Sequence, residues 1–130
     1  MARPLISVVD DDDSVRESLE SLIKSVGLAV KTFVSAEEFL ASEVLATTDC
    51  VITDVRMPGM SGIDLQRRLA ISHRDMPVIF ITAHGSDEDV RARALRDGAV
   101  DYLLKPLTED EVLSAVHAAL ASNDASDNQL

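Results

Sequence analysis

Three aspartates, a threonine and a lysine stand at the carboxyl ends of short apolar runs in this sequence. Each run has the length and composition of a buried strand. If these strands are parallel, their carboxyl ends meet at one edge of a sheet, where the five side chains would gather. The five residues are Asp10, Asp11, Asp54, Thr82 and Lys105.

Such a gathering of carboxylates predicts a metal-dependent chemistry. Carboxylates held close together repel, so a cluster of Asp10, Asp11 and Asp54 needs a cation or raised pKa values. Oxygen ligands favour a hard ion, Mg²⁺ or Mn²⁺, over zinc. A hard ion supports phosphoryl transfer, in which a carboxylate such as Asp54 can be the covalent acceptor. Thr82 and Lys105 could then bind the remaining phosphoryl oxygens.

Each of these residues also has an ordinary structural interpretation when it is taken singly. The run 10–13 could be a solvated acidic loop with a helix cap. Asp54 could be a cap or turn residue, Thr82 a satisfied strand-end hydroxyl, and Lys105 a surface charge. The chemical interpretation gains weight because all of them fall at the same end of the expected sheet.

Five apolar runs alternate with five amphipathic segments along the chain. Four runs are almost continuously apolar, as expected of strands that are covered on both faces. The second run contains Lys31 and Thr32, which suits a strand at the edge of the sheet. The runs are Leu5–Val9, Ala29–Phe33, Cys50–Thr53, Val78–Thr82 and Tyr102–Leu104.

A helix-start signal follows every run. It consists of a Ser or Thr with an acidic residue three positions later, a pair that can satisfy free N–H groups in the first helical turn. One such pair means little, but five of them, each downstream of a strand candidate, indicate five helices. The pairs are Ser14/Glu17, Ser35/Glu38, Ser61/Asp64, Ser86/Asp89 and Thr108/Glu111.

The alternation predicts an α/β fold with a doubly wound, five-stranded parallel sheet of order 2-1-3-4-5, as in flavodoxin-like (βα)5 proteins. Apolar residues at helical spacing are expected to pack on the sheet. We expect one domain over residues 1–121 and a polar tail, or the start of a linker, over 122–130. The first helix carries such a stripe in Val15, Leu19, Leu22, Ile23 and Val26, and Gly27 can end that helix.

The net charge and the cysteine content of the chain indicate which kinds of binding partner and which kinds of covalent chemistry to expect. The 130 residues carry a formal net charge of -11, which disfavours contact of this domain with nucleic acid or with an anionic membrane surface. The single cysteine, Cys50, excludes an internal disulfide, and its apolar surroundings predict a buried structural thiol rather than a redox centre. Neither a signal peptide nor a membrane span is evident, so a cytoplasmic location is the expected default.

The same residues lie in sequence blocks that resemble the signature of response regulator receiver domains, the CheY-like family. The amino-acid sequence of these blocks is similar to that of the FixJ-like branch. The resemblance runs from about Leu5 to Leu120, nearly the whole chain. The blocks are Val8-Val9-Asp10-Asp11-Asp12, Ile52-Thr53-Asp54-Val55-Arg56-Met57-Pro58-Gly59-Met60-Ser61-Gly62, Phe80-Ile81-Thr82-Ala83, Gly98-Ala99-Val100-Asp101-Tyr102-Leu103-Leu104 and Lys105-Pro106.

The resemblance implies a role for each acidic residue of the cluster. Asp54 matches the phosphoacceptor. Asp11 matches the acid that binds Mg²⁺ directly, and Asp10 the acid that acts through metal-bound water. Arg56 occupies the position whose backbone carbonyl binds the metal.

The resemblance also implies a switch. Thr82 and Lys105 match the residues that sense the phosphoryl group, and Tyr102 matches the aromatic residue that turns inward when the threonine moves. The Lys105-Pro106 peptide bond is expected to be cis, as is usual in the family. The face formed by the fourth helix, the fifth strand and the fifth helix would then change shape, and family members often dimerise through this face.

In the family, these events belong to two-component signal transduction. A histidine kinase would donate the phosphoryl group, and the output would be transcription regulation through a C-terminal DNA-binding domain that this chain lacks. The alternative is a stand-alone receiver that acts by protein-protein contact. The influence of His84, close after Thr82, on phosphoryl hydrolysis stays open, with a bystander role as the alternative.

Two further functions compete with this one. An aspartyl-phosphate hydrolase of the haloacid-dehalogenase type needs a second Asp two residues after the nucleophile, and Arg56 stands there instead. We therefore expect no enzyme beyond one that catalyses its own phosphorylation and dephosphorylation. A scaffold that works without phosphate is the other alternative, and loss of output on Asp54→Asn would exclude it.

Overall fold

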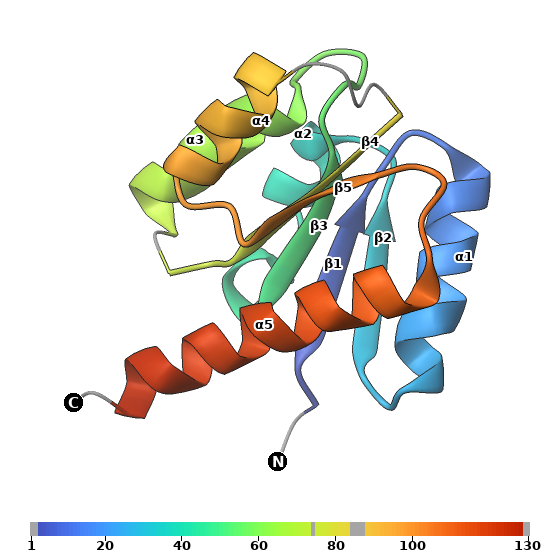
Figure 1. The fold of residues 1–130 in the computed structure, drawn as a ribbon, viewed down its shortest axis with the longest axis vertical. Helices are drawn as coiled ribbons and strands as arrows, with labels where there is room; N and C mark the ends of the chain where they lie inside the picture. Colours follow the sequence, from blue (N-terminus) through green and yellow to red (C-terminus); the bar gives the residue numbers. More distant parts are fainter. Residues whose placement is uncertain (1–2, 74, 84–87, 129–130) are drawn as a thin grey trace.

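A computed structural model shows five parallel strands in one sheet, with helices on both of its faces (Figure 1). It describes residues 3–73, 75–83 and 88–128, and the side chains of α5 as far as Ala121. The sheet order is β2-β1-β3-β4-β5, which confirms the predicted topology and places β2 at an edge. The strands are β1 (Leu5–Val9), β2 (Ala29–Phe33), β3 (Cys50–Asp54), β4 (Val78–Thr82) and β5 (Asp101–Leu104).

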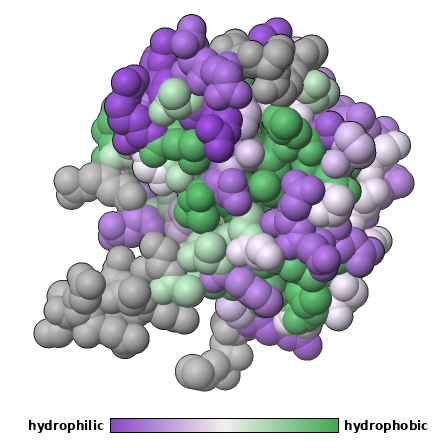
Figure 2. All heavy atoms as spheres, viewed as in Figure 1, coloured by the Kyte–Doolittle hydropathy of each residue, from purple (hydrophilic) through white to green (hydrophobic). Residues whose placement is uncertain are grey.

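The helices divide the core into two layers, one on each face of the sheet. Leu19 and Ile23 of α1 share one apolar cluster with Val112 and Val116 of α5. The other face is covered by α2, α3 and α4, whose buried side chains form the second cluster. In Figure 2, hydrophilic residues cover the outer surface over α4 and α1, and hydrophobic residues appear between them. The helices are α1 (Asp13–Ser25), α2 (Ala36–Leu40), α3 (Gly62–Ser72), α4 (Glu88–Arg96) and α5 (Glu109–Asn128), with a short 3-10 turn at Leu45–Thr47.

Three of the five predicted helix caps are confirmed. The Ser35 hydroxyl accepts the N–H of Glu38, Ser61 and Asp64 form a reciprocal capping box, and the Thr108 hydroxyl accepts the N–H of Glu111. These bonds satisfy N–H groups that have no partner within the helix itself. The predicted cap at Ser86 lies outside the described residues.

The predicted cap of α1 is wrong. Asp12, not Ser14, caps this helix, because the Asp12 carboxylate accepts the N–H groups of Ser14 and Val15. Aspartate is as good a cap as serine, so the helix begins two residues earlier than expected. At its other end Val26 is 43% exposed instead of buried, because it is the last residue before the turn at Gly27, which has a φ of 85°.

The end of the chain continues α5. The backbone of residues 122–128 is helical, and whether this segment begins a linker stays a prediction.

Cys50 is fully buried, and burial, followed by the charge of Asp49, raises its pKa to about 12. The thiol is therefore protonated at neutral pH, in agreement with the predicted structural thiol. None of the helices in the described ranges has the length and hydrophobicity that crossing a bilayer would require.

Candidate functional site

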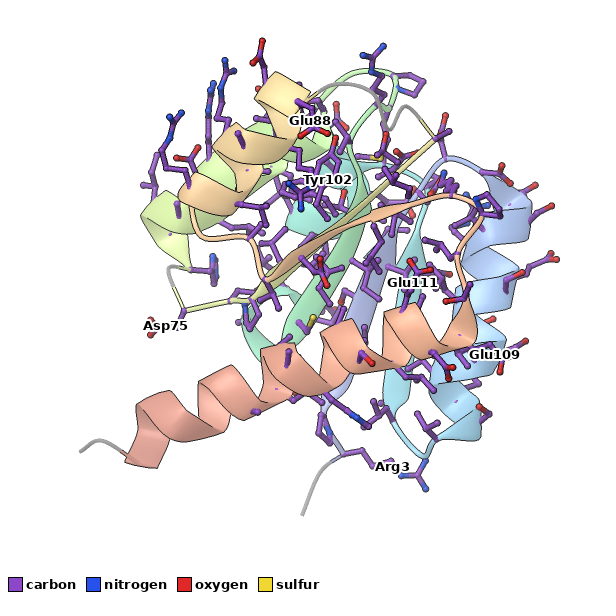
Figure 3. The ribbon with its side chains drawn as sticks, viewed as in Figure 1. Arg3, Asp75, Glu88, Tyr102, Glu109 and Glu111 are labelled. Atoms are coloured by element: carbon purple, nitrogen blue, oxygen red, sulfur yellow. The ribbon has the colours of Figure 1, made fainter. Side chains whose placement is uncertain are left out.

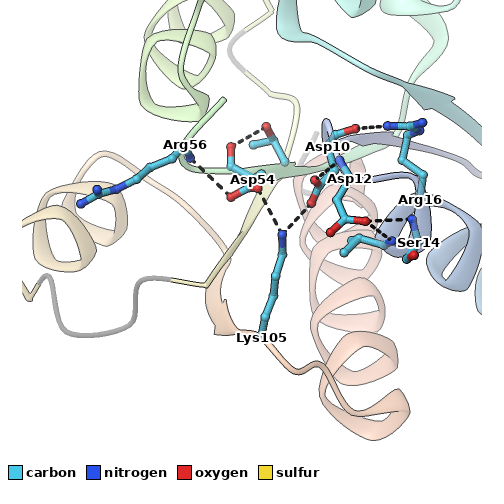
Figure 4. A network of polar contacts seen from close by, with 9 residues as sticks. Asp10, Asp12, Ser14, Arg16, Asp54, Arg56 and Lys105 are labelled. Atoms are coloured by element: carbon cyan, nitrogen blue, oxygen red, sulfur yellow. Dashed lines mark hydrogen bonds and ion pairs between the residues drawn. The ribbon is translucent and has the colours of Figure 1, made fainter. Parts of the chain in front are cut away.

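The carboxyl ends of β1, β3 and β5 bring three carboxylates and one ammonium together. Figure 4 shows Lys105 between Asp10 and Asp54. Asp10 follows β1 directly, and Asp54 is the last residue of β3, the neighbouring strand in the sheet. Asp10, Asp11 and Asp54 each offer a carboxylate oxygen, and these oxygens lie within 4.8 Å of one another. The sheet edge therefore gathers the acidic cluster that the sequence predicted.

Lys105 bridges two of these carboxylates. Its Nζ lies 3.0 Å from Oδ2 of Asp10 and 3.1 Å from Oδ2 of Asp54. The Lys105 backbone N–H donates to the carbonyl of Thr82 at 2.8 Å, which ties the residue to the end of β4. The Lys105-Pro106 peptide bond is cis, as expected.

The two carboxylates alter the titration of Lys105. Burial lowers the pKa of its ammonium, but the hydrogen bonds and charges of Asp10 and Asp54 raise it more, so the net shift is upward from 10.5. When folding raises the pKa of a lysine, the charged lysine stabilises the folded state. This contribution is complete at pH values below the pKa that the lysine has in the unfolded chain. This contribution is lost only as the pH rises through the higher folded value, so Lys105 stays charged throughout the physiological range.

Asp10 is the most deeply enclosed of the acids, with 0% of its surface exposed. Its Oδ1 accepts the N–H of Asp12 at 2.9 Å. Its Oδ2 forms an ion pair with the ammonium of Lys105 at 3.0 Å and is buried. Burial, and to a smaller extent the charge of Asp54, raises the pKa of Asp10. A buried carboxylate oxygen in this condition is one that a cation would stabilise.

The donor set therefore fits a hard divalent cation. Lys105 supplies one positive charge against three carboxylates, which leaves an excess of negative charge in a partly buried place. All the side-chain ligands offered are oxygens, as Mg²⁺ and Mn²⁺ prefer. Asp11 is exposed, so the cluster is open to solvent on that side.

The backbone around Asp54 is crowded. The Gly62 N–H donates to the carbonyl of Val55 at 2.9 Å. A Cβ at Gly62 would lie 2.2 Å from the Asp54 carbonyl oxygen, far below van der Waals contact, so only glycine fits here. Both oxygens of the Asp54 carboxylate have a partner: its Oδ1 accepts the Arg56 N–H at the long distance of 3.4 Å, and its Oδ2 accepts from Lys105 Nζ at 3.1 Å.

Thr82 lies on β4, the strand next to that of Asp54, and Tyr102 lies on β5, the strand beyond it. Asp54 pairs with Ile81 across the β3–β4 ladder, so Thr82 is one residue further along the neighbouring strand and is itself buried. Tyr102 is 6% exposed and packs on Phe80, with ring centroids 6.2 Å apart. Figure 3 shows Tyr102 between the sheet and α4.

Some predicted roles have no direct structural counterpart. The side chain of Arg56 is exposed, and a role for its backbone carbonyl stays a prediction. His84 lies outside the described residues. Conversely, sequence reasoning missed Gly62 and also Arg16, whose guanidinium donates to the Asp10 carbonyl at 2.6 Å. A glycine at the first position of a helix is a sequence signal that could have found Gly62.

Residues 6–117 match the family model of the response regulator receiver domain. The chain belongs to the response regulator receiver domain family. This receiver domain is 48% identical over 117 residues to Nodulation protein W of Bradyrhizobium diazoefficiens, covering 90% of the chain and 51% of that protein. It is 44% identical over 115 residues to the transcriptional regulatory protein FixJ of Azorhizobium caulinodans, covering 88% of the chain and 54% of that protein.

Solved structures agree with the fold of the receiver domain. The crystal structure of FixJ-N superposes with a TM-score of 0.82 at 37% sequence identity, covering 93% of this chain and 96% of that one. The match confirms the expected CheY-like fold and the similarity to FixJ. The receiver domain spans about half the length of the curated relatives named above.

Proposed function

We propose that this receiver domain accepts a phosphoryl group on Asp54 from the phosphohistidine of a histidine kinase. The observation that carries the proposal is the cluster of Asp10, Asp11 and Asp54, whose oxygens lie within 4.8 Å, with Lys105 bridging two of them. In the transfer, an Asp54 carboxylate oxygen forms a bond to phosphorus while the bond from phosphorus to the donor nitrogen breaks.

Asp10, Asp11 and Asp54, with the backbone carbonyl of Arg56, would hold Mg²⁺ or Mn²⁺. The bound ion would neutralise charge on the phosphoryl oxygens and draw them toward the acceptor. Lys105 already compensates the charge of Asp54, so it can pair with a phosphoryl oxygen once one is attached. Its raised pKa supports this role, because the ammonium stays charged at neutral pH. The domain would catalyse its own phosphorylation and dephosphorylation and no general hydrolysis.

The response to phosphorylation would pass through Thr82 and Tyr102. The modification replaces the single charge of the Asp54 carboxylate by up to about two charges on the phosphoryl group, a net gain of roughly one, and it places strong acceptor oxygens beside Thr82. Thr82 would move toward them, and the Tyr102 ring, which packs on Phe80, would adjust to the space left. Because Tyr102 belongs to β5, the change would alter the α4-β5-α5 face.

We assign this face to phosphorylation-dependent homodimerisation and to control of an output domain. The relatives named above support transcription regulation, since FixJ is named as a transcriptional regulatory protein and the match covers only 54% of its length. The output would then lie in a C-terminal DNA-binding domain. A stand-alone receiver that acts by protein-protein contact is the alternative, and the net charge of -11 fits a domain that itself contacts neither nucleic acid nor membrane.

Adding Mg²⁺ should stabilise the fold without any phosphodonor. At about one hundred times its dissociation constant, an ion that binds only the native state contributes roughly 2.7 kcal/mol. Asp11→Asn should reduce the gain at the same Mg²⁺ concentration to below about 1.5 kcal/mol, because a ligand is lost at an exposed position that the fold does not depend on. Denaturant unfolding with Mg²⁺ or EDTA measures both values. Asp110→Asn, an exposed change on α5, is the control, and an equal gain in all three proteins would contradict the assignment.

Incubation with acetyl phosphate should add one phosphoryl group when Mg²⁺ is present and none in EDTA. Intact mass spectrometry reads the gain, and size-exclusion chromatography of the same samples tests the proposed dimer. A chromogenic phosphate monoester should give no sustained turnover. Phosphorylation that proceeds equally well in EDTA would exclude a metal-dependent acceptor, and sustained turnover of the ester would favour a hydrolase.

A further inference from the structure

Arg16 makes a contact with the acidic segment that the proposed function does not use. It lies on the first turn of α1, and its side chain is only 14% exposed. Its Nη1 donates to the backbone carbonyl of Asp10 at 2.6 Å, and its Nη2 forms an ion pair with Oδ1 of Asp13. Figure 4 shows the guanidinium on the far side of Asp10 from Lys105.

The carbonyl that Arg16 holds belongs to the peptide group between Asp10 and Asp11. Fixing this peptide fixes the direction in which both side chains leave the backbone. Asp10 has further support, because its Oδ1 accepts the Asp12 N–H. Asp11 is exposed, and no side-chain hydrogen bond or ion pair in the described part of the chain holds its carboxylate. The position of the Asp11 oxygen near Asp54 therefore depends on the backbone.

We propose that Arg16 is a positioning residue for the divalent ion. By clamping the peptide between Asp10 and Asp11 to the first turn of α1, it presents the Asp11 carboxylate to the ion. This inference rests on the proposed function, since it presumes that the acidic cluster binds Mg²⁺. Partners that orient metal ligands contribute strongly to metal affinity, typically 10- to 100-fold.

The positive charge of Arg16 does not offset the gain in Mg²⁺ affinity that its positioning of Asp11 provides. A lone guanidinium near the cluster would repel a divalent cation. Asp13 neutralises it through their ion pair, so the pair adds no net charge beside the site. Arginine suits the task because its planar group reaches a carbonyl and a carboxylate together, whereas a lysine ammonium is a single point charge.

The test uses variants that separate position from charge. Asp13→Ala with Arg16→Ala removes the clamp and leaves the net charge unchanged, whereas Asp13→Ala alone leaves the bond to the Asp10 carbonyl. Glu20→Ala with Lys24→Ala is the matched control, because this pair on α1 is exposed and distant from the acidic cluster in the sequence. Mg²⁺ is titrated alone, without phosphodonor, and the amide resonances of Asp11 and Asp12 report binding by NMR.

We expect the dissociation constant for Mg²⁺ to rise at least tenfold in the Asp13→Ala/Arg16→Ala protein. It should rise by no more than about threefold in Asp13→Ala, where Arg16 loses its neutralising partner but keeps the Asp10 carbonyl, and it should stay at the wild-type value in the control. If the double variant fails to fold, Arg16→Lys, which keeps the charge, is tested in its place. We expect its dissociation constant for Mg²⁺ to rise several-fold. If the double variant binds Mg²⁺ with wild-type affinity, the proposed role of Arg16 is wrong and the proposed function is unaffected. The same holds for Arg16→Lys if the double variant does not fold. No saturable binding by the wild type overturns both.

Discussion

Replacing Asp54 by asparagine should abolish the gain of a phosphoryl group from acetyl phosphate and Mg²⁺. Asparagine has nearly the same size and can still accept the Arg56 N–H, so the strand end should keep its geometry. The amide oxygen lacks the charge of a carboxylate and cannot form the acyl phosphate. We therefore expect complete loss, measured as the absence of the phosphorylated mass after full reaction of the wild type.

Two controls make the result specific to Asp54. Asp75→Asn changes an exposed acid (labelled in Figure 3) and should leave phosphorylation unchanged. Circular dichroism should show that the Asp54→Asn protein is folded. A mass gain of unchanged size in the folded variant would show that another residue is the acceptor, and the proposal for Asp54 would then be wrong.

Gly62→Ala should cost about 3 kcal/mol of unfolding free energy, at the upper end of the usual penalty for overpacking. The added methyl group would lie 2.2 Å from the Asp54 carbonyl oxygen and 3.2 Å from the ring of Phe80. The carbonyl belongs to a central strand and cannot rotate away, so relief requires that β3 and α3 move apart. Denaturant unfolding measures the loss, and phosphorylation of the folded fraction should be slowed as well.

Gly27→Ala separates a general loss of stability from a slower phosphorylation of Asp54. Gly27 has a φ of 85° but open space around its Cα, so alanine there adds backbone strain of about 1 to 2 kcal/mol without a clash. It lies at the end of α1 away from Asp54 and should leave the phosphorylation rate unchanged. Equal rates in Gly62→Ala and the wild type would show that the close approach of α3 does not position the acceptor.

The fold and the convergence of the acids could be predicted because they follow from local patterns. Apolar runs set the strands, and a parallel sheet places Asp10, Asp54 and Lys105 at one edge whatever the details of packing. The strand ends were correct to within a residue: β3 includes Asp54 and β5 begins at Asp101.

The contacts that hold the site could not be predicted in this way. The clamp by Arg16 depends on how the loop after β1 turns into α1, and the use of Asp12 in place of Ser14 as the cap decides that turn. The need for glycine at position 62 arises from a distance between α3 and β3. Local propensity carries no information on such a distance, which is set when the two elements pack.

The contrast between Asp10, which is sealed from solvent, and Asp11, which is not, has a kinetic consequence. Substitution of either carboxylate should weaken the binding of an ion, and the open side at Asp11 is the route by which an ion would enter and leave. Within the described ranges, no segment has to open to admit an ion from the Asp11 side. An ion bound as proposed would therefore exchange with the surrounding pool without any opening of the fold, and its occupancy would follow a fall in free magnesium.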